Sequence, residues 1–460
     1  MEIYRPKYHF TVKKGWINDP NGFCYFKGKY HLFFQYYKEP HPGCMCWGHA
    51  VSDDLIHFEE LEPAIIPNSY YDKDGSWSGS SFVKDGILYL MYTGHCCTEN
   101  GNIQTQNIVI SEDGYNFKKY EGNPVISLKD LPSNCSIADF RDPSIFEYDD
   151  EYYVLIGNKS KENIAQLLLY KSSDLLNWKY ERTLISSNDL GYMLECPSSA
   201  KIGDKRVLIM SPQGLKDKDE HFWNVYSSIY MVGGSLDLKK LDHSKYKEID
   251  HGLDFYAPHI ISNGNILISW MNIWERTIPL QEMGSKWINA FTLPRRVSLK
   301  NNKLIQKPLE SIDSYFANEK TFEGMVKKEK YFNEFKGRFK HHHIEFNYGG
   351  ELSVKLLKKE DKYLEIKYEN NTLIFDRRNS LYLIKSYKEE KSSCNYRMIK
   401  LHKKKVMLDI YLDGSFIEVY INNGEEVMSM TCFNPIDYED ISLSSKNGKK
   451  VRIISKDFIS

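Results

Sequence analysis

The sequence predicts an all-β protein, a five-bladed β-propeller followed by a C-terminal β-sandwich. Two observations support this prediction: an internal repeat of paired strands occurs five times in the first part of the chain, and short runs of alternating polar and apolar residues fill the rest. With 460 residues, the chain exceeds the usual size of one domain. We place the propeller at residues 1–300, a linker at 301–325 and the sandwich at 326–460.

Each repeat consists of a short polar motif, an apolar run, a turn and a second apolar run. The runs are rich in β-branched and aromatic residues, and Lys-Gly, Asp-Gly, Asp-Asp, Gly-Asp or Asn-Gly joins them, which is typical of β-hairpins. The regular spacing indicates one propeller blade per copy. The copies are NDPNGFCYFKGKYHLFFQY (18–36), SGSSFVKDGILYLMYTG (78–94), RDPSIFEYDDEYYVLIG (141–157), ECPSSAKIGDKRVLIMSP (195–212) and YAPHIISNGNILISWMN (256–272).

A second element follows the first three copies and predicts the later strands of each blade. VSDDLIHF (51–58), ISEDGYNF (110–117) and KSSDLLNW (171–178) each combine a strand end, a Ser-x-Asp turn and an aromatic residue. The repeat stops near Pro294, and residues 293–316 are predicted to form a last strand and a connector. Beyond them the alternation favours an antiparallel sandwich, for which we expect a supporting role without chemistry.

Composition narrows the class of partner. The 61 Lys and Arg residues balance the 62 Asp and Glu residues, so neither a nucleic acid nor an anionic membrane is an expected partner. The N-terminus lacks the apolar stretch of a signal peptide, and the nine Cys suit reduced thiols, so we expect a cytoplasmic protein. No metal is expected, because successive His residues such as 341–343 point to alternate faces of a strand.

Three copies of the repeat carry a carboxylate in the opening motif, namely Asp19, Asp142 and Glu195. The first strand of each blade lines the axis of a propeller, so these groups should meet in one funnel. One such motif alone is more often a turn, but three in corresponding copies favour a site. A pair of carboxylates is what glycoside hydrolysis requires.

These motifs resemble those of glycoside hydrolase family 32, which includes invertases, sucrose-6-phosphate hydrolases, levanases and inulinases. The resemblance covers nearly the whole chain and agrees with a five-bladed propeller plus a sandwich. It is carried by WINDPNG (16–22), SGS (78–80), RDP (141–143), ECP (195–197), WGHAVSDDLIHFEEL (47–61), GYMLECP (191–197), IMSPQG (209–214), DHGLDFYAPH (250–259), FTLPRRVSL (291–299) and LDIYLDGSFIEVYINNG (408–424).

The resemblance implies a retaining β-fructofuranosidase that uses no cofactor. Asp19 matches the nucleophile, Glu195 the acid/base, and Asp142 the group that binds fructosyl hydroxyls and stabilises the transition state. The expected substrate-binding residues are Trp16, Asn18, Gln35, Trp77, Ser78 and Arg141 against the sugar, with Tyr256 and Trp274 at the rim.

One departure from the family pattern bears on the leaving group. HPGCMCWGH (41–49) carries Gly43 near the place where many relatives have an aromatic residue, so we expect a more open leaving-group side and Trp47 in the core.

The exact substrate stays open between sucrose, sucrose 6-phosphate and a short fructan. A phosphate would need a cation at the mouth of the funnel, for which His41, His49 and Arg276 are candidates. The alternatives are an exo-acting hydrolase of levan or inulin, a fructosyltransferase that uses the same intermediate, and a non-catalytic sugar-binding propeller. The sequence does not indicate an oligomeric state.

Overall fold

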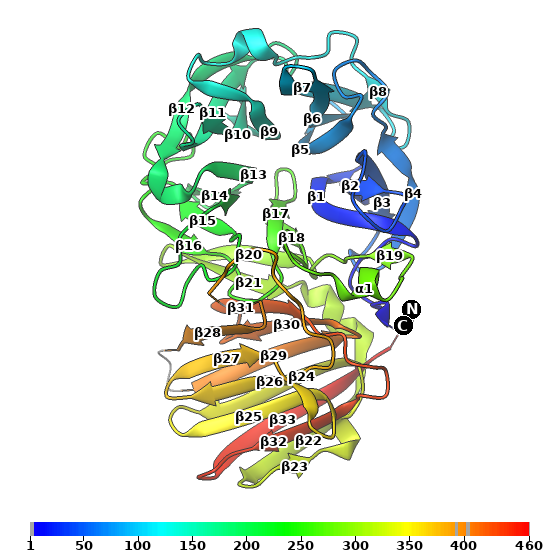
Figure 1. Cartoon of the computed structure of the whole chain (residues 1–460), viewed down its shortest axis with the longest axis vertical. Helices are drawn as coiled ribbons and strands as arrows, with labels where there is room; N and C mark the ends of the chain where they lie inside the picture. The colour runs from blue at the N-terminus through cyan, green and yellow to red at the C-terminus, as the bar shows by residue number, and fades with distance from the viewer. Residues whose placement is uncertain (1–3, 392–393, 402–404, 460) are drawn as a thin grey trace.

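The computed structural model describes residues 4–391, 394–401 and 405–459, and it confirms the all-β fold (Figure 1). Five sheets form a ring in the N-terminal part, and two larger sheets lie beneath it. The helical segments are short: α1 (Pro279–Glu282) and the 3-10 turns η2 (Leu128–Asp130), η3 (Asn188–Leu190), η4 (Glu310–Tyr315) and η5 (Asn333–Phe335). Within the described ranges, no helix has the length and hydropathy needed to cross a membrane.

The five sheets close into a ring through their innermost strands. Each inner strand contacts the next, and the fifth contacts the first, as a propeller requires. These strands are β1 (Gly15–Phe26), β5 (Gly75–Lys84), β9 (Cys135–Tyr148), β13 (Met193–Ile202) and β17 (Tyr256–Ile260). Each predicted repeat therefore coincides with the first two strands of one blade.

The outer strands follow in order from the axis. They are β2 (Lys29–Tyr37), β3 (Cys46–Ser52) and β4 (Phe58–Ile65); β6 (Ile87–Thr98), β7 (Gly101–Ser111) and β8 (Lys118–Lys119); β10 (Glu151–Ser160), β11 (Ala165–Ser172) and β12 (Lys179–Ser187); β14 (Lys205–Gln213), β15 (Ile229–Val232) and β16 (Tyr246–Glu248); and β18 (Ile266–Trp270), β20 (Arg295–Lys300) and β21 (Lys303–Pro308). A further short strand, β19 (Trp287–Ile288), pairs in parallel with β1 and so ties the last blade to the first.

The predicted Ser-x-Asp turns lie between the third and fourth strands of their blades. In each turn the Asp carboxylate accepts hydrogen bonds from the backbone N–H groups two and three residues later, as at Asp54, Asp113 and Asp174. The side chain thus stabilises a tight corner that repeats from blade to blade.

The C-terminal part is a sandwich of two six-stranded sheets around one apolar core. One sheet has the order β22 (Phe316–Val326), β33 (Lys449–Phe458), β24 (Phe339–Asn347), β29 (Lys405–Asp413), β30 (Phe416–Ile421) and β31 (Glu426–Thr431). The other has the order β23 (Lys330–Tyr331), β32 (Asp440–Ser444), β25 (Glu351–Lys359), β26 (Lys362–Glu369), β27 (Thr372–Asp376) and β28 (Tyr396–Lys400).

The segment expected to be a linker, 301–325, contains strands of both parts. Its first half includes β21, which pairs with β20 in the fifth blade, and its second half lies in β22, which pairs with β33 in the sandwich. β21 forms the outer edge of the fifth blade, and β22 forms one edge of a sandwich sheet. We therefore propose a domain boundary at residues 309–315, which hold the 3-10 turn η4.

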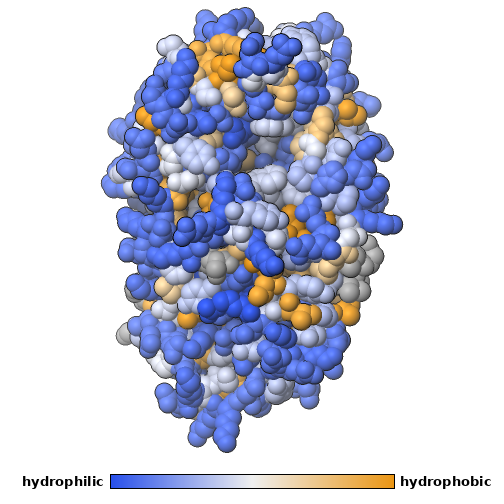
Figure 2. All heavy atoms as spheres, in the orientation of Figure 1, coloured by the Kyte–Doolittle hydropathy of each residue, from blue (hydrophilic) through white to orange (hydrophobic). Residues whose placement is uncertain are grey.

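Buried ion pairs join the propeller to the sandwich. Arg295 of β20 bonds to Glu418 of β30 over 2.5 Å and to Asp250 over 2.9 Å, and all three side chains are fully buried. The ring of His9 lies between Asp413 and Glu418, 2.9 Å from each. These contacts fix how the two parts sit against each other. On the face shown in Figure 2 the surface is largely hydrophilic, with its hydrophobic residues in scattered groups.

Candidate active site

A β-bulge interrupts every inner strand at the predicted motif. From Ile17 to Pro20, for example, β1 advances three residues while its partner β2 advances two, from Tyr36 to Phe34. The same shift occurs in β9, β13 and β17. Each of these four bulges contains or ends at a Pro, which has no N–H to offer the ladder.

The bulge changes where side chains point. Asp142, Cys196 and Ala257, each the residue before the Pro, adopt positive φ angles of 66°, 47° and 50°. Asp142 and Asp19 directly precede the Pro, whereas Glu195 stands one position earlier. Two successive positions of the motif can therefore deliver a side chain to the axis, which a regular strand with alternating faces would not allow.

All three carboxylates line one pocket of about 640 Å³ at one end of the inner strands. They come from three different blades, and they approach one another through Cys196, whose backbone N–H donates to Asp142 Oδ2 over 2.9 Å and whose Sγ lies 3.6 Å from Asp19 Oδ2. Seven of the eight predicted binding residues line the same pocket: Trp16, Asn18, Gln35, Trp77, Ser78, Arg141 and Trp274.

Asp19 is partly buried, and within the described ranges its carboxylate accepts a hydrogen bond at one oxygen only. The Ser78 hydroxyl donates to Asp19 Oδ2 over 2.8 Å, while Oδ1 has no hydrogen-bond partner among the described residues. Burial raises the pKa of Asp19 to about 6, and the charge of Glu195 acts in the same direction. A poorly solvated carboxylate with one unbonded oxygen is suited to attack a carbon atom.

Glu195 is oriented by three donors. Gln213 Nε2 and the Tyr256 hydroxyl donate to Glu195 Oε2 over 2.7 and 2.6 Å, and Arg141 donates to Oε1 over 2.9 Å. Since every partner donates, the arrangement suits the carboxylate that would act as a base.

Asp142 completes the charged floor of the pocket. Burial raises its pKa to about 7, while the nearby Arg141 guanidinium opposes that rise. The same Arg141 lies between Asp142 and Glu195, at 4.0 and 2.9 Å, so one cation serves two of the three carboxylates. The site thus holds three acidic groups whose charges depend on one another.

Trp16 and Trp77 differ in how much of each ring is exposed to the pocket. Trp16 is almost fully buried, stacks on Trp274 at 5.7 Å and donates its ring N–H to Asn18 Oδ1 over 2.7 Å. Trp77 stacks on His95 at 3.9 Å and is partly exposed. Much of the Trp16 ring therefore packs between the first and fifth blades, while Trp77 presents more of its surface to the pocket.

Tyr256 does not line the rim as expected. It is 1% exposed, and it lies behind Glu195, to which its hydroxyl donates. Tyr256 stands in β17 at the position that Glu195 occupies in β13, and its hydroxyl reaches Glu195 from the neighbouring blade.

Several pocket residues were not predicted. Gln213 directly follows the fourth copy and pairs with Met193, two residues before Glu195, so its place near Glu195 could have been predicted from that hairpin. Tyr226, Glu275, Gln281 and Tyr387 also line the pocket but lie outside the repeated motifs, which offer no signal for them.

Two of the three candidate phosphate ligands are not available. His49 is buried, its ring bonds to His31, and burial lowers its pKa to about 3. Arg276 lines the pocket, but its side chain is fully buried in ion pairs with Glu390 and Asp254, so its charge is already neutralised. His41 is exposed but is not among the residues that line the pocket, and Trp47 packs in the core as expected.

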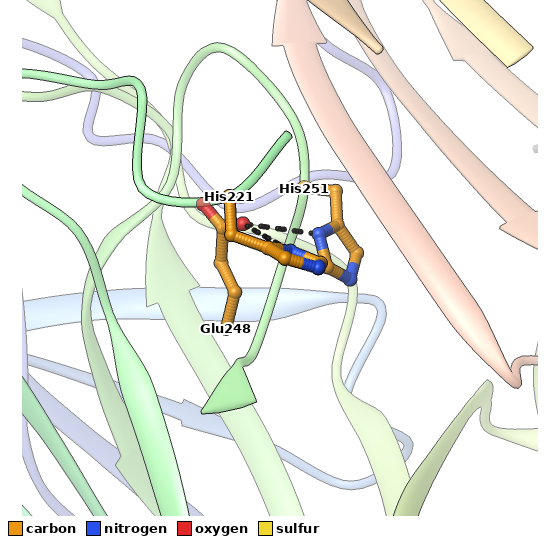
Figure 3. Close-up of side chains that lie close together, drawn as sticks. All are labelled: His221, Glu248 and His251. Carbon is orange, nitrogen blue, oxygen red and sulfur yellow. Dashed lines mark hydrogen bonds and ion pairs between the residues drawn. The ribbon is translucent and has the colours of Figure 1, made fainter. Parts of the chain in front are cut away.

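A second cluster joins His221, Glu248 and His251 at the domain interface (Figure 3). Both rings approach Glu248 Oε2, at 3.4 and 3.1 Å, while Arg397 of the sandwich donates to Oε1 over 2.8 Å. Hydrogen bonds to Glu248 and Glu426 outweigh burial and raise the pKa of His251 to about 9. Both ring nitrogens of His251 are bonded to carboxylates, Nδ1 to Glu248 and Nε2 to Glu426, so the cluster forms an ion-pair network.

Comparison with known proteins agrees with the geometry. Residues 9–308 match the family model "Glycosyl hydrolases family 32 N-terminal domain" and residues 312–458 match "Glycosyl hydrolases family 32 C terminal". A sucrose-6-phosphate hydrolase of Bacillus subtilis (strain 168) is 33% identical over 94% of this chain and 89% of its own length.

Solved structures show the same fold. A sucrose-6-phosphate hydrolase from Lactobacillus gasseri superimposes with a TM-score of 0.90 at 28% identity, covering 100% of this chain and 94% of that one. A Bombyx mori GH32 beta-fructofuranosidase mutant in complex with sucrose gives 0.84 at 30% identity, covering 99% and 94%. The chain therefore belongs to glycosyl hydrolase family 32 and is a glycoside hydrolase.

Proposed function

We propose that the enzyme hydrolyses the β-fructofuranosyl bond of sucrose or sucrose 6-phosphate with retention, through a covalent fructosyl-enzyme intermediate. The observation that carries this proposal is the meeting of Asp19, Asp142 and Glu195 from three blades on the floor of one pocket.

The geometry suggests which residue performs each step of the reaction. Asp19 attacks the anomeric carbon while Glu195 protonates the departing oxygen. Glu195, oriented by Gln213 and Tyr256, then takes a proton from the water that releases fructose. Asp142 binds fructosyl hydroxyls, and Arg141 moderates the repulsion among the acidic groups.

The substrate class rests on the relatives and on the pocket. The family includes enzymes named for sucrose 6-phosphate and one solved with sucrose, and a small fructoside suits a pocket of about 640 Å³. We place the enzyme in the cytoplasm, because the Cys residues in the described ranges form no disulfide with one another, as expected in a reducing compartment.

The test is a comparison of kcat/KM on sucrose, sucrose 6-phosphate, 1-kestose and inulin. We expect one of the two sucrose substrates to be cleaved fastest, and Asp19→Asn to lower turnover more than about a thousandfold while the fold persists. Fastest cleavage of inulin would favour an exo-acting fructan hydrolase. Oligosaccharides as the main products at high sucrose would favour transfer, and binding without cleavage would favour a sugar-binding propeller.

A further inference from the structure

One segment of the sandwich reaches the rim of the active-site pocket. The described part of the connection between β27 and β28, residues 377–391 and 394–395, extends from the sandwich to the propeller (Figure 1). Its backbone pairs with the chain after β18: Thr277 N–H donates to the Lys385 carbonyl over 2.8 Å, and Tyr387 N–H donates to the Glu275 carbonyl over 2.7 Å. The segment thus adds a short antiparallel pairing next to the pocket.

Buried charge holds this segment in place. Glu390 accepts hydrogen bonds from Arg276 over 3.0 and 2.5 Å, and the side chains of both residues are at most 1% exposed. Lys388 bonds to the Tyr226 hydroxyl over 2.8 Å and to Glu275 over 3.0 Å. Breaking the buried Glu390–Arg276 pair would be strongly unfavourable, so the segment forms a fixed wall of the pocket.

Tyr387 is the residue that this wall presents. It lines the pocket, yet it remains 69% exposed, whereas the backbone on which it stands is paired. Gly43 also lines the pocket and offers no side chain of its own. An exposed aromatic ring on a fixed backbone provides a flat apolar surface with a polar hydroxyl, which suits the face and edge of a sugar.

The position of Tyr387 identifies which sugar it would meet. The carboxylates that act on the fructosyl unit come from the inner strands of the propeller, whereas Tyr387 belongs to the other domain and enters at the rim. The part of a substrate that extends toward the rim is the leaving group. We propose that the sandwich domain completes the leaving-group subsite, with Tyr387 as a specificity-determining contact for the sugar that departs.

This inference rests on the proposed fructofuranosidase activity, and the experiment separates the two. Tyr387→Ala and wild type are compared on sucrose, sucrose 6-phosphate and methyl β-D-fructofuranoside, whose methyl leaving group is too small to reach the rim. Tyr382→Ala is the matched control, because Tyr382 is an exposed aromatic residue of the same segment that is not part of the pocket lining.

We expect Tyr387→Ala to lower kcat/KM about tenfold, mainly through KM, on whichever sucrose substrate wild type cleaves faster. The methyl fructoside should be cleaved within about twofold of the wild-type rate, as should all substrates by Tyr382→Ala. An unchanged rate on both sucrose substrates, or an equal loss on the methyl fructoside, would overturn the inference while leaving the proposed function intact. If wild type cleaved none of the three, the proposed function itself would be wrong.

Discussion

Replacement of Ser78 by Ala tests whether Asp19 is the group whose ionisation controls activity. Ser78 is buried, and its hydroxyl donates to Asp19 Oδ2 over 2.8 Å. This hydrogen bond favours the ionised form of Asp19. A hydrogen bond to a charged group contributes about 1.5–3 kcal/mol, and 1.36 kcal/mol corresponds to one pH unit. Ser78→Ala should therefore raise the pKa of Asp19 by about one to two pH units.

The direction of the effect follows from the chemistry. Attack requires ionised Asp19, so activity is lost as the pH falls through its pKa, which is about 6 in the wild type. The acid limb of kcat/KM for sucrose should then move to higher pH in Ser78→Ala. The matched control is Ser80→Ala, since Ser80 lies on the same strand but accepts from the Ile145 N–H and does not contact Asp19. An acid limb that stays in place, or moves to lower pH, would show that ionisation of Asp19 does not control activity.

The buried ion pairs of Arg295 and His9 hold the two domains together, and each can be tested by substitution. Arg295→Met leaves Asp250 buried without its cation and Glu418 with His9 alone, so the free energy of unfolding in urea should fall by about 3–5 kcal/mol. The exposed neighbour Arg296→Met should change it by less than about 0.5 kcal/mol, and equal losses would contradict this role. Hydrogen bonds to Asp413 and Glu418 outweigh burial and raise the pKa of His9 to about 9, so its contribution of about 3 kcal/mol is present below about pH 6.5 and is lost as the pH rises through about 9. His9→Gln should weaken the fall in unfolding free energy between neutral and alkaline pH, and a pH dependence identical to that of wild type would count against the ion pair.

The inner half of each blade could be predicted from the sequence because its signals are local. Hairpin turns such as Asp85-Gly86 and the Ser-x-Asp corners are determined by neighbouring residues, and they recur in the copies. The gathering of Asp19, Asp142 and Glu195 in one pocket then follows from closure of the ring. Even the Pro residues of the motifs, which interrupt the ladder, mark where the bulges lie.

What could not be predicted depends on contacts between distant segments. Tyr387 reaches the pocket through contacts between the two domains, namely the Glu390–Arg276 ion pair and the backbone pairing of Tyr387 with Glu275, which no local pattern reveals. The strand β19 belongs to the first sheet although it lies near the end of the propeller sequence. A motif gives the position of Tyr256 along its strand but not the direction of its side chain at a bulge. The sequence therefore does not reveal that its ring lies behind Glu195 and not at the rim.

The proposed mechanism requires a covalent bond between Asp19 and fructose. In Glu195→Gln, p-nitrophenyl β-D-fructofuranoside should load the enzyme, because this leaving group needs no proton, while the missing base slows release. Rapid acid quenching, proteolysis and mass spectrometry should then find one added fructosyl unit on the peptide that contains Asp19. A burst of nitrophenol with the fructosyl unit on another peptide, or on none, would contradict the account.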